Sequence, residues 1–158
     1  MAEQSKLRVF PVVSRRDKKR FLNYPWTLYR DDPLWVPPLR QNQKELVNYT
    51  KHPFYDDAEI ETFLAERDGE ICGRVAAILN HAHNRVHPDD QRGFIGFFES
   101  IDDQEVADGL LDAAKEWFAA RGVSDLRGPV NPSLNYECGM LVENFTICLL
   151  YTSDAADE

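Results

Sequence analysis

The sequence has few cysteines, no excess of basic residues and no long apolar run, and each absence excludes a class of protein. Its three cysteines, Cys72, Cys138 and Cys148, show no Cys-x-x-Cys spacing, which leaves a disulfide framework or zinc site unsupported. The formal net charge of −9 argues against a nucleic-acid partner, which requires a strongly basic face. No run reaches the roughly 18 apolar residues of a membrane span, and MAEQSKLRV has no signal-peptide core, so we expect a cytoplasmic protein.

The last eleven residues, Cys148 to Glu158, resemble the translation of a transposon-end sequencing adapter. Every position of CLLYTSDAADE matches one adapter codon. We therefore expect residues 148–158 to be a non-native tail and residues 1–147 to be the N-terminal part of a longer protein. The alternative is a natural polar C-terminus. Without the tail, which carries three acids and no base, the net charge is −6, and the remaining length suits one domain or half of a larger one.

Hydrophobic periodicity predicts a mixed-sheet α+β fold in the order strand, helix, helix, hairpin, strand, long helix, strand. A stiff, proline-containing connector, DDPLWVPPL at 31–39, separates the first two helices. The polar stretch 81–92 is expected to be a loop. The predicted strands are residues 6–13, 59–66, 71–79, 93–99 and 125–130, and the predicted helices are residues 15–29, 40–48 and 103–121.

Several local signals set the ends of these elements. Ser14 is a candidate N-cap for the first helix, which Pro25 is expected to bend or restart. Asp68-Gly69 between two apolar runs is the strongest hairpin signal in the sequence. Asp102, with Glu105 three residues later, forms a capping box that would begin the long helix.

Five segments together resemble the YghO-type, bacterial ceramide-synthase-like family of proteins related to the GNAT acyl-CoA N-acyltransferases. The resemblance covers nearly all of residues 6–145 in the family's order. It implies a GNAT-like fold, here truncated after about the fifth strand, and transfer of an acyl group from acyl-CoA to an amine, in some members a sphingoid base. The segments are YPWTLYRDDPLWVPPL at 24–39, HPF at 52–54, FLAERDGEICGRVAAILN at 63–80, GFIGFFES at 93–100 and RGPVNPSLNYECGMLVENF at 127–145.

The resemblance also implies where acyl-CoA would bind. In GNAT-like enzymes the thioester lies between two splayed parallel strands, backbone N–H groups stabilise the oxyanion, and the pyrophosphate lies on a glycine-rich loop at the next helix N-terminus. The corresponding strand here is residues 93–99. The expected Gln/Arg-x-x-Gly-x-Gly/Ala loop is absent, and SIDDQE at 100–105 takes its place with three carboxylates that would repel a pyrophosphate.

We therefore hypothesise that residues 1–147 are a degenerate GNAT-like half, inactive alone, and that a C-terminal part binds acyl-CoA. The alternative is a catalytically inert GNAT-like module that binds a ligand or partner.

The most site-like stretch is GPVNPSLNYECG at 128–139, because polar loops after a strand are where α/β proteins bind ligands. Its alternative is a turn whose side chains only satisfy local backbone groups. Glu137 is the candidate general base for the amine. The alternative is that Glu137 is an exposed or salt-bridged residue without a catalytic role. The candidate substrate-binding residues are Asn131, Ser133, Asn135 and Tyr136.

Three further groups have a structural and a functional interpretation. His81, His83 and His87 are interpreted as a solvated linker, and we expect no metal site. The tryptophans at 26, 35 and 117 and the phenylalanines at 94, 97 and 98 suit a core, and the phenylalanines alternatively suit an acyl tunnel. The basic run, interpreted as a solvated helix face or as a peripheral membrane contact, consists of Arg15, Arg16, Lys18, Lys19 and Arg20.

Overall fold

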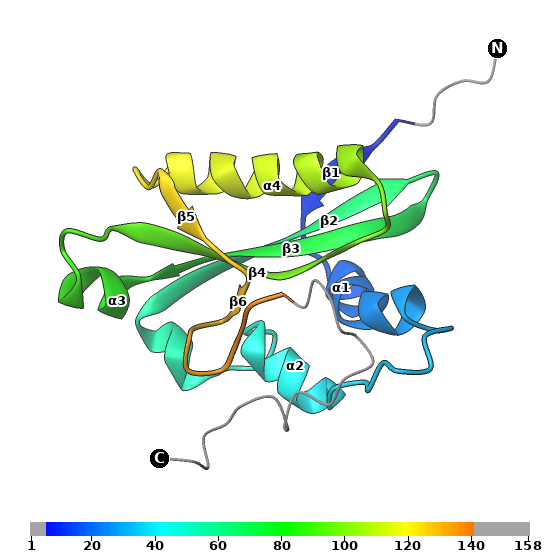
Figure 1. Ribbon diagram of the computed structural model, residues 1–158, viewed down its shortest axis with the longest axis horizontal. Helices are drawn as coiled ribbons and strands as arrows, with labels where there is room; N and C mark the ends of the chain where they lie inside the picture. Colours follow the sequence, from blue (N-terminus) through cyan, green and yellow to red (C-terminus); the bar gives the residue numbers. More distant parts are fainter. Residues whose placement is uncertain (1–5, 141–158) are drawn as a thin grey trace, which may run out of the picture.

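A five-stranded mixed sheet lies between helices on both faces in the computed structural model, which describes residues 6–140 (Figure 1). The strand order is β1-β2-β3-β4-β5, in which β4 and β5 run parallel and the other neighbours antiparallel. These strands are β1 (Arg8–Pro11), β2 (Ala58–Arg67), β3 (Glu70–Asn80), β4 (Arg92–Ser100) and β5 (Asp125–Arg127). The predicted adapter tail lies outside the described residues.

Four helices and a small second sheet complete the fold. Figure 1 shows α4 on one face of the sheet and α1 and α2 on the other. A 3₁₀ turn at Pro53–Asp56 leads into β2. The remaining elements are α1 (Arg15–Leu28), α2 (Arg40–Leu46), α3 (His81–Val86), α4 (Gln104–Ala119) and an antiparallel pair, β6 (Val130–Asn131) with β7 (Glu137–Cys138).

The predicted hairpin is confirmed at its turn. Asp68 and Gly69 have φ values of +54° and +84°, and glycine adopts the second without a Cβ penalty. Arg67 pairs with Glu70 across this two-residue loop, so β2 and β3 share one antiparallel ladder. This ladder forms the centre of the sheet.

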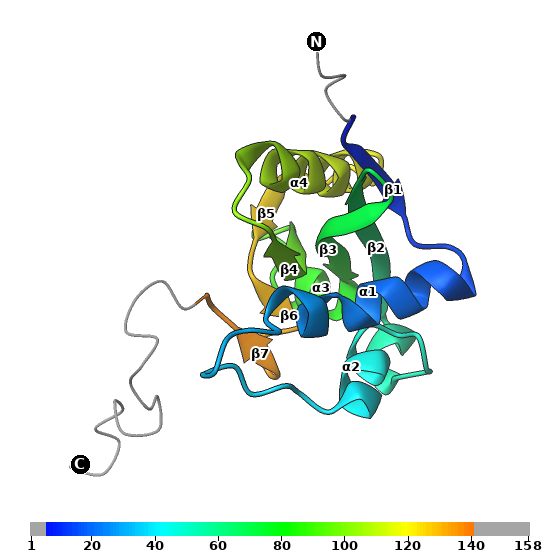
Figure 2. The same cartoon turned by 90° about the vertical axis from the view of Figure 1, so that its right-hand side faces the viewer.

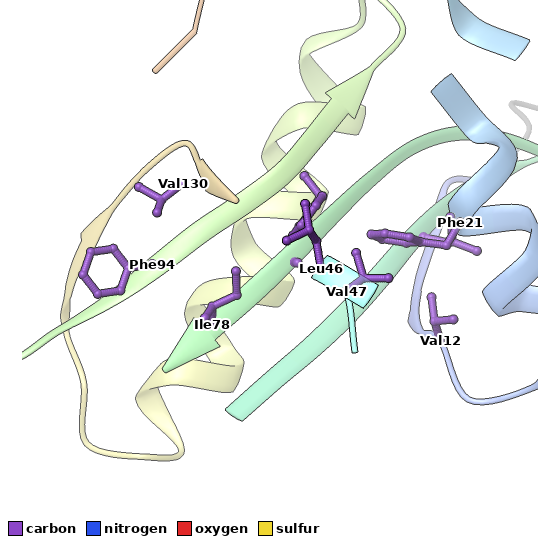
Figure 3. Packing of buried hydrophobic residues seen from close by; sticks show 10 residues of the cluster. Val12, Phe21, Leu46, Val47, Ile78, Phe94 and Val130 are labelled. Carbon is purple, nitrogen blue, oxygen red and sulfur yellow. The ribbon is translucent and has the colours of Figure 1, made fainter. Parts of the chain in front are cut away.

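Alternation along the strands divides the core into two layers. The layer under α4 takes residues such as Phe63 and Val75, together with the buried helix residues Leu110 and Phe118. The opposite layer, under α1 and α2, is shown in Figure 3. It contains Val12, Phe21, Leu46, Val47, Leu64, Ala76, Ile78, Phe94, Phe97 and Val130.

The structure corrects four local predictions. Asp103, not Asp102, caps α4, because the Asp103 side chain accepts the N–H groups of the first turn. Residues 81–86 form the short helix α3 rather than a loop, because the Asn80 side chain caps its first turn. Helix α1 continues through Pro25 without restarting. The predicted strand 125–130 is divided, since β5 ends at Arg127 and Val130 pairs in the second sheet.

Candidate functional site

A cleft of about 310 Å³ opens between the C-terminal part of β4, the connector 31–39 and the segment 128–140. The polar groups in its lining come from β3, β4, α2 and the β6–β7 pair, whereas the connector contributes apolar side chains. The lining residues are Pro25, Trp35, Val36, Pro38, Gln43, Arg74, Phe97, Phe98, Glu99, Pro129, Asn131, Glu137, Gly139 and Met140.

A buried ion pair forms the floor of this cleft. Arg74 of β3 pairs with Glu99 of β4 directly across the ladder, and Arg74 Nε donates to Glu99 Oε2 at 2.7 Å. The guanidinium also donates Nη1–H to the carbonyl of Phe21 in α1 at 2.9 Å. Burial raises the pKa of the Glu99 carboxyl, which Arg74 opposes, and burial lowers the pKa of Arg74. The pair therefore connects the sheet to α1.

The strand β4 is irregular beside this pair. Its register with β3 shifts between Arg74 and Ala76, and Phe97 has a φ of +50°, which is unusual for a bulky residue. The N–H of Phe97 turns away from β3 and donates to Asn131 Oδ1 at 2.6 Å. Asn131 in turn donates from Nδ2 to Glu137 Oε2 at 3.2 Å. The bulge and the two-stranded sheet are thus joined through one amide side chain.

The structure brings together only part of the predicted site. Asn131 and Glu137 line the cleft, and the Glu137 charge contributes to the raised pKa of Glu99, so the two carboxylates face the same space. Ser133, Asn135 and Tyr136 are not among the lining residues. Ser133 Oγ accepts the N–H of Asn135 at 3.3 Å, which is the local turn given as the alternative.

Tyr136 packs outside the cleft. Its ring lies 5.7 Å from that of His52 and 6.3 Å from that of Phe54, measured between centroids. His52 is therefore a packed residue, and its Nδ1 accepts the N–H of Phe54. These contacts attach the 133–136 turn to the 3₁₀ segment.

Sequence reasoning missed Arg74 and Glu99. A signal was present, because a single arginine interrupts the apolar run ICGRVAAIL and a single glutamate ends the run GFIGFFE. A charge within a strand that is otherwise buried usually requires a partner. Only the register of β3 with β4 identifies that partner.

The N-terminus of α4 does not fit the pyrophosphate of CoA. Asp103 Oδ1 accepts the N–H groups of Glu105 and Val106 at 2.9 and 3.3 Å, so two donors of the first turn are already bonded. Arg67 contacts Asp103 and Glu105 at 2.6 Å each, and its hydrogen bond lowers the pKa of the Asp103 carboxyl. Two carboxyl groups, each paired with Arg67, therefore lie at the helix terminus at which an anion would bind.

The gap expected for a thioester between the parallel strands is also closed. A Cβ added to Gly96 would lie 2.1 Å from the carbonyl oxygen of Val130, and one added to Gly128 would lie 2.5 Å from that of Ile95. The main chain of 128–131 thus packs directly on residues 95–97 of β4. The bulge N–H of Phe97 is occupied by Asn131 instead of being free to stabilise an oxyanion.

The histidines do not form a metal site in the described part of the chain, where no group of three or more potential ligands gathers. His81 pairs with Glu59 at 3.0 Å, and the rings of His83 and His87 lie 4.7 Å apart. Burial lowers the pKa of His83. Among residues 6–140, no helix is both long and apolar enough to cross a membrane.

No protein-family model matches the chain. Two curated relatives do match: protein YghO of Escherichia coli is 34% identical over 133 residues, and the bacterial ceramide synthase of Caulobacter vibrioides is 35% identical over 139 residues. These alignments cover 84% and 88% of this chain but only 34% and 36% of the relatives, so the chain spans about a third of their length.

Solved structures show the same fold. A soil-metagenome aminoglycoside acetyltransferase in complex with sisomicin aligns with a TM-score of 0.54 and 12% identity, over 78% of this chain and 77% of that one. The aminoglycoside N-acetyltransferase AAC(6')-Iy in complex with CoA aligns with a TM-score of 0.52 and 16% identity, over 84% and 82%. The solved structures thus show a GNAT-like fold, and the two curated relatives identify the chain as a member of the YghO-type, bacterial ceramide-synthase-like family.

Proposed function

We propose that the chain is the acceptor-side part of an acyl-CoA-dependent N-acyltransferase whose acceptor is a lipid amine of the sphingoid type, and that it does not itself bind CoA. The observation that carries this proposal is that side chains of the chain itself bond the N–H groups with which a GNAT-like enzyme would hold CoA. Asp103 accepts an N–H at the start of α4, and Asn131 accepts the Phe97 N–H of the β4 bulge. Identity of 35% to a bacterial ceramide synthase supports the reaction class.

The cleft suits an amine that carries an apolar chain. Its polar end holds Glu99, already paired with Arg74, and Glu137, whose hydrogen-bond donor is the neutral amide of Asn131. Glu137 is therefore the carboxylate available to bind an ammonium group and to accept its proton, which leaves the amine nucleophilic. Trp35, Val36, Phe98 and Met140 supply apolar walls for the chain of such an amine.

Calorimetric titration of the chain tests both parts of the proposal. We expect no binding of CoA at micromolar concentration and clear binding of a medium-chain primary amine. The matched alcohol, which lacks the ammonium group, should bind more weakly because Glu137 then has no charge to pair with. Glu137→Gln should weaken binding of the amine and leave that of the alcohol unchanged. Micromolar affinity for CoA would contradict the assignment of this part of the protein.

The second candidate is an inert GNAT-like module that binds a ligand or partner. The N–H groups bonded by Asp103 and Asn131 favour this candidate too, because these contacts stabilise the fold without any catalytic role. The two candidates differ when Glu137→Gln is introduced at the corresponding position of a full-length relative with measurable acyl transfer. Loss of activity that excess amine does not restore supports the acceptor-side role, because Glu137 would also accept the proton, and unchanged activity supports the inert module.

A further inference from the structure

A groove of about 560 Å³ lies between α1 and α2 and carries a concentrated positive charge. Three of its cations come from α1 and two from α2, although the whole protein has a net charge of −9. No aspartate or glutamate belongs to its lining. The lining residues are Arg15, Lys18, Lys19, Leu22, Asn23, Trp26, Arg40, Gln41, Gln43, Lys44 and Tyr49.

The five cations of this groove have no carboxylate partner within residues 6–140. None of them belongs to a salt bridge there, whereas the neighbouring Arg20 pairs with Asp17 and Glu66. The basic run of the sequence is thus divided, because Arg20 stabilises the fold and Arg15, Lys18 and Lys19 face the groove. Like charges held together repel one another, and an anionic ligand would relieve that repulsion.

Aromatic rings hold two of the cations in place. The guanidinium of Arg40 lies 3.9 Å from the Trp26 ring centroid and also donates to Asn23. The ammonium of Lys18 lies 5.1 Å from the ring centroid of Tyr49. Cations positioned over rings are partly ordered before any ligand arrives, so less side-chain freedom is lost on binding.

Large apolar residues close in sequence to the groove residues are exposed to solvent. Val13, two residues before Arg15, is 78% exposed, and Leu39, directly before Arg40, is 79% exposed. Val36 of the same connector is 84% exposed. Figure 2 looks onto the side that carries α1, α2 and this connector. Cations next to exposed apolar side chains are typical of surfaces that bind the lipid–water interface.

The opposite side of the molecule has the opposite charge. Helix α4, across the sheet in Figure 1, borders a surface lined by Glu105, Asp108, Asp112 and Glu116. An anionic membrane would repel this side and attract the groove. The charge distribution therefore gives the protein one preferred orientation at such a surface.

We propose that the α1–α2 groove binds the phosphate headgroups of anionic membrane lipids and, with Val36 and Leu39 in the interface, docks the protein on the membrane. The docking rests on the proposed function in one respect, because the protein would meet a lipid acceptor at the membrane surface. Docking itself requires neither the amine nor acyl-CoA. It also specifies which residues of the basic run act.

Co-sedimentation with vesicles tests the docking without any acyl transfer. Vesicles of phosphatidylcholine and phosphatidylglycerol in a roughly two-to-one ratio should retain the chain, and pure phosphatidylcholine should not. Lys18→Gln with Lys44→Gln should weaken retention about 25-fold, at about fivefold per charge, and added salt should weaken that of the wild type. Equal retention on both vesicle types, or no effect of the double substitution, would overturn the proposal.

Two matched controls keep the result specific. Lys115→Gln removes one charge from α4, where Lys115 pairs with Asp112, and should leave retention unchanged. Val36→Ser with Leu39→Ser should weaken retention on vesicles but leave binding of inorganic phosphate unaltered. Phosphate binding with no retention on vesicles would show a soluble-anion site and refute membrane docking. Thermal melts that match the wild type confirm that these substitutions leave the fold intact.

Discussion

Replacing Arg74 by methionine is the sharpest test of the buried ion pair beneath the cleft. The change retains an apolar stem but removes the partner of Glu99 and the donor to the Phe21 carbonyl. The Arg74 side chain is 4% exposed and that of Glu99 is 20% exposed, so water cannot fully replace the lost contacts. Breaking one side of a buried pair costs about 3–5 kcal/mol. In a protein of this size that lowers the melting temperature by about 10 °C or more.

The loss should depend on pH. Burial already raises the pKa of Glu99 above its ordinary value of 4.5, and without Arg74 that pKa rises further. The folded state then binds the proton more tightly than the unfolded state, so its stability falls as pH rises from 4.5 through the raised folded value. Arg74→Met should therefore be less damaging at about pH 5 than at about pH 8.

Thermal melts of four proteins check this reasoning: wild type, Arg74→Met, Glu99→Met and the double variant. The double variant should recover most of the loss, because an apolar pair replaces the ionic one without leaving a buried charge. Lys115→Met, in an exposed pair, serves as the control and should hardly change the melt. A loss below about 1 kcal/mol, or one equal at both pH values, would refute the structural role assigned to the pair.

Three further predictions concern the elements around the cleft. Asn131→Ala should lower the free energy of unfolding by about 1–3 kcal/mol, measured with denaturant, because the Phe97 N–H loses its acceptor. Gly96→Ala should displace the Val130 strand and increase its hydrogen exchange, since the new methyl group would lie 2.1 Å from a carbonyl oxygen. The hydrogen bond from Arg67 lowers the pKa of Asp103, so the ionised carboxylate stabilises the folded state above about pH 3.8. This stabilisation is lost as the pH falls through the pKa of the folded state. Asp103→Asn should therefore flatten the acid-unfolding curve followed by circular dichroism.

The central fold follows from local patterns in the sequence. Alternation along 59–66 and the Asp68-Gly69 turn predict the hairpin, and the 3.6-residue period predicts α4. Patterns of this kind were sufficient because α4 buries one face and because two adjacent residues set the hairpin turn. The divided strand after Arg127 could not be predicted, because the close approach of Val130 to Gly96 depends on contacts distant in the sequence.

The candidate site was only partly predictable. Asn131 and Glu137 were proposed because they lie in a polar loop after a strand, which is a local signal, and both line the cleft. Arg74 and Glu99 were missed because 25 residues and the register of two strands separate them. Ser133 and Asn135 belong to a turn, since their contact with each other satisfies the backbone locally. Polar loops indicate a site more reliably than they indicate which side chains point into it.

The core and the two donor sites at which the family resemblance would place CoA are built from different residues. The two layers of the core are built from apolar residues such as Leu64 and Phe118, and none of these needs a ligand. The N–H donors that a thioester and a pyrophosphate would require are each satisfied by one polar side chain of this chain, Asn131 and Asp103. Because buried or helix-terminal N–H groups need acceptors, these two side chains stabilise the fold without a bound ligand. The likeness to a CoA complex at 16% identity is a likeness of fold, whereas the Asn131 and Asp103 contacts are observations on the residues of this chain.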